Sequence, residues 1–392
     1  MALNPKGAGA SLLSTVPEAW PGLVDAVEKP EAALGLQGSS WDGFLAGLRA
    51  NGLLPLAYRA MRDAAVLPRL APACRSRIEA AMAAHLATWT VSWAEIDRLL
   101  AALAGAGLHP IPIKGADLSI RAYPEPHLRP ISDLDVLFPS LEEAERAYAL
   151  LQGLGYRSES PGLSGAPWAL SHHLPALENP ANKFQVEVHG SILWTPRDGR
   201  WEGGASRLLE GRDSFTYKGV ALEGLRAEAN LIFLCAHMFL LHADVQPKAI
   251  VLFDLRYLLQ CCEQGLDWQE LSELAAVTRM ETPTYKGLAL AHQLLGVPVP
   301  ANVLEALRAR ADFGAISLDN ANSQKVVNAV MQAKGFTGPF LLAFHMIFPS
   351  APYMRFRYPE RAGWPIAMLY LFRWWSQAKK LAKWAGAKVP FS

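Results

Sequence analysis

A short run near the middle of the chain reads SDLDVLF at residues 132–138, and polar and apolar residues alternate along it. Alternation with a period of two predicts a β-strand, because successive side chains of a strand point to opposite sides of the sheet. Asp133 and Asp135 then project from one face, and Leu134 and Val136 from the other. The run therefore predicts a sheet that carries two carboxylates on one face and apolar side chains on the other.

The segments on either side complete a small core between residues 108 and 222. Further strands are predicted at residues 109–113, 156–157, 174–178 and 184–189. The turn signal Asn179-Pro180-Ala181-Asn182 predicts that the last two strands form a hairpin. Residues 141–153 have a helical pattern, with Ser140 as the expected N-cap. Strands combined with a helix indicate an α/β or α+β core.

Helical periodicity governs the two zones that flank this core. Residues 1–107 are rich in Ala and Leu, and apolar residues recur at three- and four-residue spacing over 71–104. That spacing predicts one long helix or two. In the third zone, residues 223–392, helices are predicted at 227–242, 250–264, 267–280 and 285–295. The expected fold is α+β, with a small sheet flanked by N- and C-terminal helical regions.

The composition excludes several classes of protein. The chain has 392 residues, of which 51% are hydrophobic and 19% charged, so it is not a disordered chain. Its formal net charge is +1, which argues against nucleic acid as a partner. None of the four cysteines forms a C-x-x-C pair, which argues against a zinc ribbon. The first residues contain no signal-peptide run, and we expect a soluble, cytoplasmic protein.

The two aspartates of the central run are the first candidates for chemistry. Carboxylates a few ångströms apart repel each other, and a divalent cation between them removes the repulsion. A few oxygen ligands suit Mg²⁺ that is bound jointly with substrate phosphates. The alternative is that Asp133 and Asp135 are an exposed acidic pair on an edge strand.

A possible phosphate site precedes the two aspartates. Lys114 and Gly115 lie where a short strand is expected to give way to a helix that runs to Tyr123. A glycine at such a turn lets backbone N–H groups approach an anion, and the helix N-terminus favours negative charge. Lys114 adds a point charge that suits phosphate, and Arg129 is a second candidate cation.

A third carboxylate follows on a separate predicted strand, which carries Glu187 and His189. Three acidic residues, a lysine and a glycine turn together indicate metal-assisted phosphoryl or nucleotidyl transfer. His189 could contact a substrate phosphate or tune Glu187. The alternative for His189 is a strand-end histidine with structural hydrogen bonds.

Taken together, these stretches resemble the core of the uncharacterised nucleotidyltransferase family of bacteria, within the DNA polymerase β-like superfamily. The resemblance rests on residues 113–123, Arg129 and the run at 132–137. It extends to GLGY at 153–156, VEVH at 186–189, and the segments 234–242 and 253–255. It covers most of the chain and weakens after about residue 300. It implies a mixed sheet with helices on one side and a metal site on its strands.

The resemblance also implies roles for the site residues. Asp133 and Asp135 would bind two Mg²⁺ ions, and Glu187 would complete the metal site or activate the attacking hydroxyl. A nucleoside triphosphate, expected to be ATP, would donate its nucleoside monophosphate to a hydroxyl on a peptide, protein or small molecule, with release of pyrophosphate. The superfamily usually has Gly-Ser where this chain has Lys114-Gly115. The alternative is therefore a catalytically degenerate member that binds a nucleotide, peptide or protein partner.

The end of the chain has an unusual composition. Residues 364–388 contain four tryptophans and several lysines, and no acidic residue follows Glu360. A basic, Trp-rich helix is typical of segments that contact a membrane surface or another anionic partner. The alternative is that its apolar stripe packs on the protein and leaves the lysines in solvent.

Overall fold

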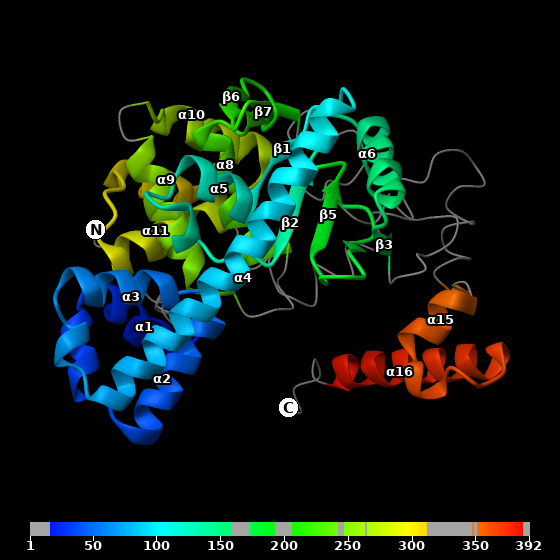
Figure 1. Ribbon diagram of the computed structural model, residues 1–392. Helices are drawn as coiled ribbons and strands as arrows, with labels where there is room; N and C mark the ends of the chain where they lie inside the picture. The colour runs from blue at the N-terminus through cyan, green and yellow to red at the C-terminus, as the bar shows by residue number, and fades with distance from the viewer. Residues whose placement is uncertain are drawn as a thin grey trace, which may run out of the picture.

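A small β-sheet lies at the centre of the computed structural model, between a group of helices and helix α6 (Figure 1). The structure describes residues 16–158, 173–192, 206–241, 247–262, 265–311, 347–348 and 351–386.

The central sheet has five strands in the order β1-β2-β5-β4-β3. Their bounds are β1 Ile111–Pro112, β2 Asp133–Leu137, β3 Arg157–Ser158, β4 Leu177–Glu178 and β5 Gln185–His189. Strands β2 and β5 pair in parallel, and the other neighbours are antiparallel. The α+β fold and the mixed sheet are confirmed, and β4 and β5 pair as the predicted hairpin.

The apolar face of the sheet follows from the alternation in the sequence. Four completely buried side chains project from this face: Leu134, Val136, Val186 and Val188. They pack with the second half of α4 (Pro72–Gly105) and with α6 (Leu141–Gly153) in one hydrophobic cluster. Helix α6 has its predicted N-cap, because the backbone N–H of Glu143 donates to Ser140 Oγ at 3.1 Å. This packing leaves the opposite face of β2 and β5 for polar side chains.

The predicted N- and C-terminal helical zones share a second hydrophobic cluster. The N-terminal helices are α1 Trp20–Glu28, α2 Gly38–Ala50 and α3 Leu54–Asp63, and a short 3₁₀ segment, Pro30–Gly35, joins α1 to α2. The helices after the sheet are α8 Ala227–Ala236, α9 Ile250–Cys261, α10 Trp268–Thr278, α11 Glu281–Leu295 and α12 Ala301–Arg310. Segments from the two halves of the chain therefore stabilise each other, and α4 contributes side chains to both clusters.

Two elements differ from the sequence prediction. The helix expected at 227–242 ends as α8 at Ala236 and continues as a π-helical turn, His237–Leu241. A hairpin of β6 (Asp213–Tyr217) and β7 (Val220–Gly224) was not predicted. Its two-residue loop, Lys218-Gly219, has positive φ at both positions, which is the geometry that matches the twist of a hairpin.

The tail forms α15 (Ala351–Arg357) and α16 (Ile366–Gly386). Leu369 is buried, whereas Leu371 is 61% and Trp375 54% exposed. Ala367, Leu371 and Trp374 of the expected stripe are all exposed, so among the described residues this stripe is not packed on the protein, and Lys388 lies outside the described residues. Every helix in the described part of the chain is too short or too polar to cross a bilayer.

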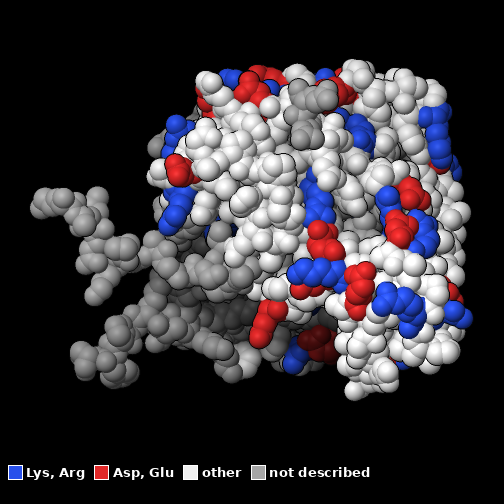
Figure 2. Space-filling model, turned by 90° about the vertical axis from the view of Figure 1, so that its left-hand side faces the viewer, with Lys and Arg blue, Asp and Glu red and all other residues white. Residues whose placement is uncertain are grey.

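The charged side chains of one flank of the molecule are shown in Figure 2. Basic and acidic side chains are interspersed there and are separated by uncharged surface. Among the described residues, this flank carries no extended area of a single sign.

Candidate functional site

Strands β2 and β5 place the acidic side chains on one face of the sheet. Asp133 and Asp135 share a face of β2, and the parallel register sets Asp135 beside Glu187 on β5. Asp135 is 5% exposed, and Asp133 and Glu187 are partly buried. The structure thus brings together the three carboxylates that the sequence singled out.

Lys114 reaches the same place from the start of α5 (Lys114–Arg121). Its Nζ lies 2.7 Å from Asp135 Oδ1 and 3.6 Å from Glu187 Oε2. The backbone N–H of Ile113 donates to the carbonyl of Asp135 at 3.1 Å, which ties the turn to β2. Lys114 has a φ of 53°, and a lysine in this left-handed region costs roughly 1–3 kcal/mol. The Lys-Gly turn therefore delivers an ammonium group to the carboxylates.

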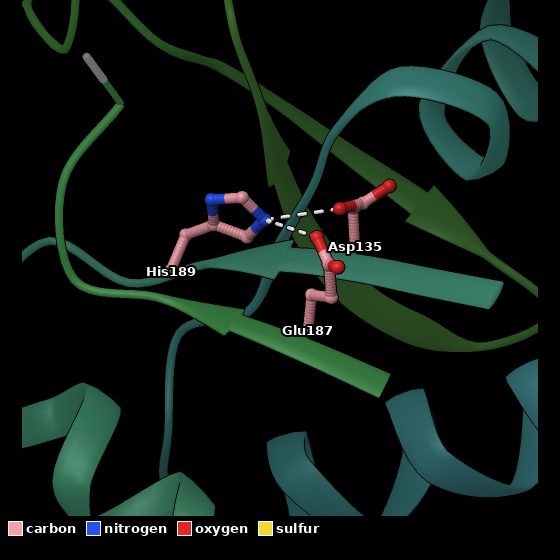
Figure 3. Close-up of side chains that lie close together, drawn as sticks. All are labelled: Asp135, Glu187 and His189. Atoms are coloured by element: carbon pink, nitrogen blue, oxygen red, sulfur yellow. Dashed lines mark hydrogen bonds and ion pairs between the residues drawn. The ribbon is translucent and has the colours of Figure 1, made fainter. Parts of the chain in front are cut away.

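His189 completes this cluster at the end of β5. Its side chain is fully buried, and its Nε2 lies 3.0 Å from Asp135 Oδ1 and 3.7 Å from Glu187 Oε2 (Figure 3). One ligand atom from each of Asp135, Glu187 and His189 lies within 4.8 Å of the others, so the three residues could hold a metal ion. The sequence pointed to His189 as a phosphate contact or a partner of Glu187, and the structure directs its Nε2 at both Glu187 and Asp135.

The charges of the cluster follow from burial and from these contacts. Burial and the neighbouring charge of Asp135 raise the pKa of Asp133 to about 6, against the opposing effect of Lys114. Burial opposes ionisation of Glu187, but His189 and Lys114 together hold its pKa well below the usual range. Burial also lowers the pKa of Lys114, but the nearby carboxylates outweigh that effect and raise it. The positive charge of Lys114 is therefore too little to offset both the burial of Asp133 and its repulsion by Asp135.

The donor set fits a divalent cation. A carboxyl group whose pKa is raised by burial and a like charge loses that repulsion when a cation binds beside it. The oxygen atoms of Asp133, Asp135 and Glu187 suit Mg²⁺, and the imidazole nitrogen of His189 widens the choice to other divalent metals. A metal ion bound by Asp135 and Glu187 would share these two carboxylates with Lys114.

Arg129 lies at the edge of the site, but its hydrogen bonds point elsewhere. Its Nε and Nη2 donate to the two oxygens of Asp254 on α9 at 2.7 and 2.9 Å. Its Nη1 donates to the carbonyl of Pro130 at 2.7 Å, and the Tyr123 hydroxyl donates to Asp254 at 2.7 Å. Arg129 therefore joins the sheet region to α9 while one edge of its guanidinium borders the site.

The cluster opens into a cavity of about 430 Å³. Lys114, Gly115, Asp133, Asp135 and Glu187 form one wall. The other walls come from distant parts of the chain: Arg49, Gly52, His237, Met238, Lys248, Ile250 and Val251. Sequence reasoning missed these residues, because no local motif links positions 49 and 248 to a strand at 133. The cavity has the size of a small-molecule site.

Comparison with known protein families adds one finding. A family model described as an uncharacterised nucleotidyltransferase matches residues 37–296. No curated protein and no solved structure matches the chain. The matched segment runs from the residue before α2 to the residue after α11, and it includes all of the residues that line the cavity.

Proposed function

Because the chain belongs to this family of uncharacterised nucleotidyltransferases, we propose that it transfers a nucleoside monophosphate from a nucleoside triphosphate to an acceptor hydroxyl. Mg²⁺ is the proposed metal, ATP the first donor to test, and pyrophosphate the leaving group. The acceptor would be a hydroxyl on a peptide, a protein or a small molecule.

A single observation carries this proposal. Three carboxylates from two neighbouring parallel strands project into one cavity, beside an ammonium group from a strand-to-helix turn. Asp133 and Asp135 would bind the metal, with Glu187 or His189 completing its ligands. A divalent ion held there would neutralise phosphate charge in the transition state.

The protein's own residues account for the remaining steps. The acceptor oxygen attacks the α-phosphorus in line, and the bond from that phosphorus to the bridging oxygen of pyrophosphate breaks. Glu187, whose pKa is lowered by His189 and Lys114, would complete the metal site or take the acceptor's proton. Lys114 would orient Asp135 and Glu187 and offset negative charge near the phosphates. Positioning and charge neutralisation supply most of the rate enhancement.

Substitution of the aspartates tests the proposed function. We expect Asp133→Asn and Asp135→Asn each to reduce transfer at least about a hundredfold, the equivalent of a few kcal/mol of lost charge stabilisation. Transfer is measured by incubation with each labelled nucleoside triphosphate and cell extract, followed by mass spectrometry of labelled products and an assay for pyrophosphate. Asp25→Asn, a surface residue paired with Lys29, is the matched control. Full transfer by both variants would refute the proposal.

The second candidate function is binding without catalysis. It is favoured by the Lys114 ammonium, which lies 2.7 Å from Asp135 and so occupies a cation position itself. Lys114-Gly115 also stands where the superfamily has Gly-Ser. Calorimetry with ATP and Mg²⁺, followed by the pyrophosphate assay, separates the candidates: binding with no pyrophosphate release in the presence of cell extract would favour the second.

A further inference from the structure

Two basic residues from outside the sheet line the same cavity as the three carboxylates. Arg49 belongs to the last turn of α2, and Lys248 lies two residues before α9. Both side chains are exposed, and neither makes an ion pair with another described residue. Arg49 and Lys248 therefore differ from the two other basic residues that line the cavity. Lys114 is paired with Asp135, and Arg129 is paired with Asp254.

The turn after α2 docks on the start of α9 and holds these two residues at the same edge. The backbone N–H groups of Ala249 and Ile250 donate to Asn51, to its side-chain Oδ1 and its carbonyl respectively, each at 3.2 Å. The Asn51 amide donates to the carbonyl of Gly47 at 3.0 Å, so its side chain is fixed from both sides. Arg49 precedes Asn51 by two residues, and Lys248 directly precedes Ala249. The contacts of Asn51 with Ala249 and Ile250 thus hold the chain at Arg49 close to the chain at Lys248.

Close backbone contact at this joint requires a glycine. Gly52 has a φ of +72°, and a Cβ at this position would lie 3.3 Å from Ile250 Cβ. A side chain would therefore be strained in its backbone and would push the turn away from α9. The turn after α2 therefore cannot move away from α9 without losing these contacts.

We propose that Arg49 and Lys248 bind the β- and γ-phosphates of the donor, so that the triphosphate spans the cavity from the carboxylates to this basic pair. The inference rests on the proposed function and adds to it. A triphosphate carries several negative charges, and the three carboxylates that line the same cavity repel the part of it that no metal neutralises. Arg49 and Lys248 supply the compensating charge, as an arginine fork and a lysine point charge respectively.

The proposal predicts a selectivity. The site would distinguish nucleotides by the number of phosphates, because only the β- and γ-phosphates would contact this pair. Inorganic tripolyphosphate, which has the charges without the nucleoside, should compete with the nucleoside triphosphate for this site. Binding of a nucleoside monophosphate should not depend on Arg49 and Lys248.

Direct binding measurements on the full chain test this inference without relying on transfer. Arg49→Ala, Lys248→Ala and the double variant are titrated by calorimetry with ATP, tripolyphosphate and AMP in the presence of Mg²⁺. Each single substitution should weaken binding of ATP and of tripolyphosphate roughly tenfold, as loss of a hydrogen bond between charged groups does, and leave AMP binding unchanged. Arg49→Lys should retain part of the affinity, because it keeps the charge and loses the fork.

The matched control removes the same two charges elsewhere. The double variant Arg69→Ala, Lys29→Ala alters exposed basic residues outside the cavity, and it should bind ATP like the unaltered chain. Thermal melting of every variant checks that the fold is intact.

The outcomes separate this inference from the proposed function. Equal ATP affinity for the unaltered chain and the Arg49/Lys248 double variant would overturn the inference and leave the transferase proposal standing. ATP binding that needs the pair, in a chain that transfers no nucleotide to any acceptor, would support the inference and refute the transferase. An unaltered chain that binds neither ATP nor tripolyphosphate would overturn both.

Discussion

Asp135 is the residue on which the contacts of the site converge. Its Oδ1 accepts hydrogen bonds from both Lys114 Nζ and His189 Nε2, at 2.7 and 3.0 Å. Burial raises the pKa of an isolated carboxyl, but these two partners outweigh burial and lower the pKa of Asp135. An ionised, buried carboxylate of this kind depends on a nearby positive charge, which Lys114 supplies in the absence of a metal ion.

Substitution of Lys114 therefore tests how far its charge stabilises the buried carboxylates. We expect Lys114→Met to lower the melting temperature in metal-free buffer, because the substitution keeps the buried stem and removes the charge that compensates Asp135 and Glu187. The loss should be a few kcal/mol, on the order of breaking one half of a buried ion pair. Added Mg²⁺ should restore more stability to the variant than to the unaltered chain, since an ion can then occupy the cation position. Differential scanning calorimetry with EDTA and with Mg²⁺ measures both effects.

A surface lysine provides the control for this prediction. Lys183 pairs with Glu178 at 2.8 Å, but its side chain is 69% exposed. Lys183→Met should change stability by less than about 1 kcal/mol and show no added response to Mg²⁺. The same Mg²⁺ response in the Lys114 variant and in the unaltered chain would count against a metal site at Asp135 and Glu187.

At the scale of elements, the packing of α11 on α8 depends on one small residue. A Cβ at Gly287 of α11 would collide with the sulfur of Cys235 on α8 and lie 3.2 Å from its Cβ. Both helices belong to the buried cluster shared by the two halves of the chain, so neither has room to shift freely. The glycine is needed here for a close approach between helices, not for a special φ.

The element-scale prediction follows from this contact. In an exposed helix, Gly→Ala stabilises by up to about 1 kcal/mol, but here we expect Gly287→Ala to destabilise by about 1–3 kcal/mol, because the core is overpacked. Cys235→Ala should relieve the clash, so that the double variant is more stable than the sum of the single changes implies. Urea unfolding of the four proteins of this cycle measures the coupling. Additive effects would show that Cys235 is not the residue that excludes a larger side chain at 287.

At the scale of the whole molecule, one buried ion pair joins the sheet region to the C-terminal helices. Arg129 and Asp254 are far apart in the sequence, yet the Asp254 side chain is 1% and the Arg129 side chain 16% exposed. The Tyr123 hydroxyl donates to the same carboxylate, and burial with the Asp254 charge raises the pKa of Tyr123. Arg129 from this joint, and Gly52 and Ile250 from the one at Asn51, line the cavity.

Substitutions of Arg129 and Asp254 test the contribution of this ion pair to stability. Arg129→Met should cost about 3–5 kcal/mol of unfolding free energy, because Asp254 is left buried without its partner. Asp254→Leu in the same chain should recover part of the loss, since both charges are then replaced by apolar groups. Denaturant unfolding at neutral pH measures both steps. If the double variant is no more stable than the single one, the loss stems from packing and not from the orphaned charge.

Local patterns in the sequence predicted the elements whose formation depends on near neighbours. The alternation at 132–138 predicted β2 and the shared face of Asp133 and Asp135, and Ser140 marked the start of α6. Other local features were missed: the hairpin at 213–224, which lacks a strongly apolar run, and the π-helical turn at His237, which interrupts a uniformly apolar helix.

The sequence by itself determined which side chains share a face of a strand, because the two-residue repeat of a strand is a property of the backbone and needs no partner. It also indicated that the Lys-Gly turn carries a charge suited to phosphate. Only the packed structure shows that Arg129 pairs with Asp254, and that Arg49 and Lys248 line the same cavity as Asp133. Contacts of this kind depend on how helices from both halves of the chain pack into a common core, and no local spacing encodes that packing.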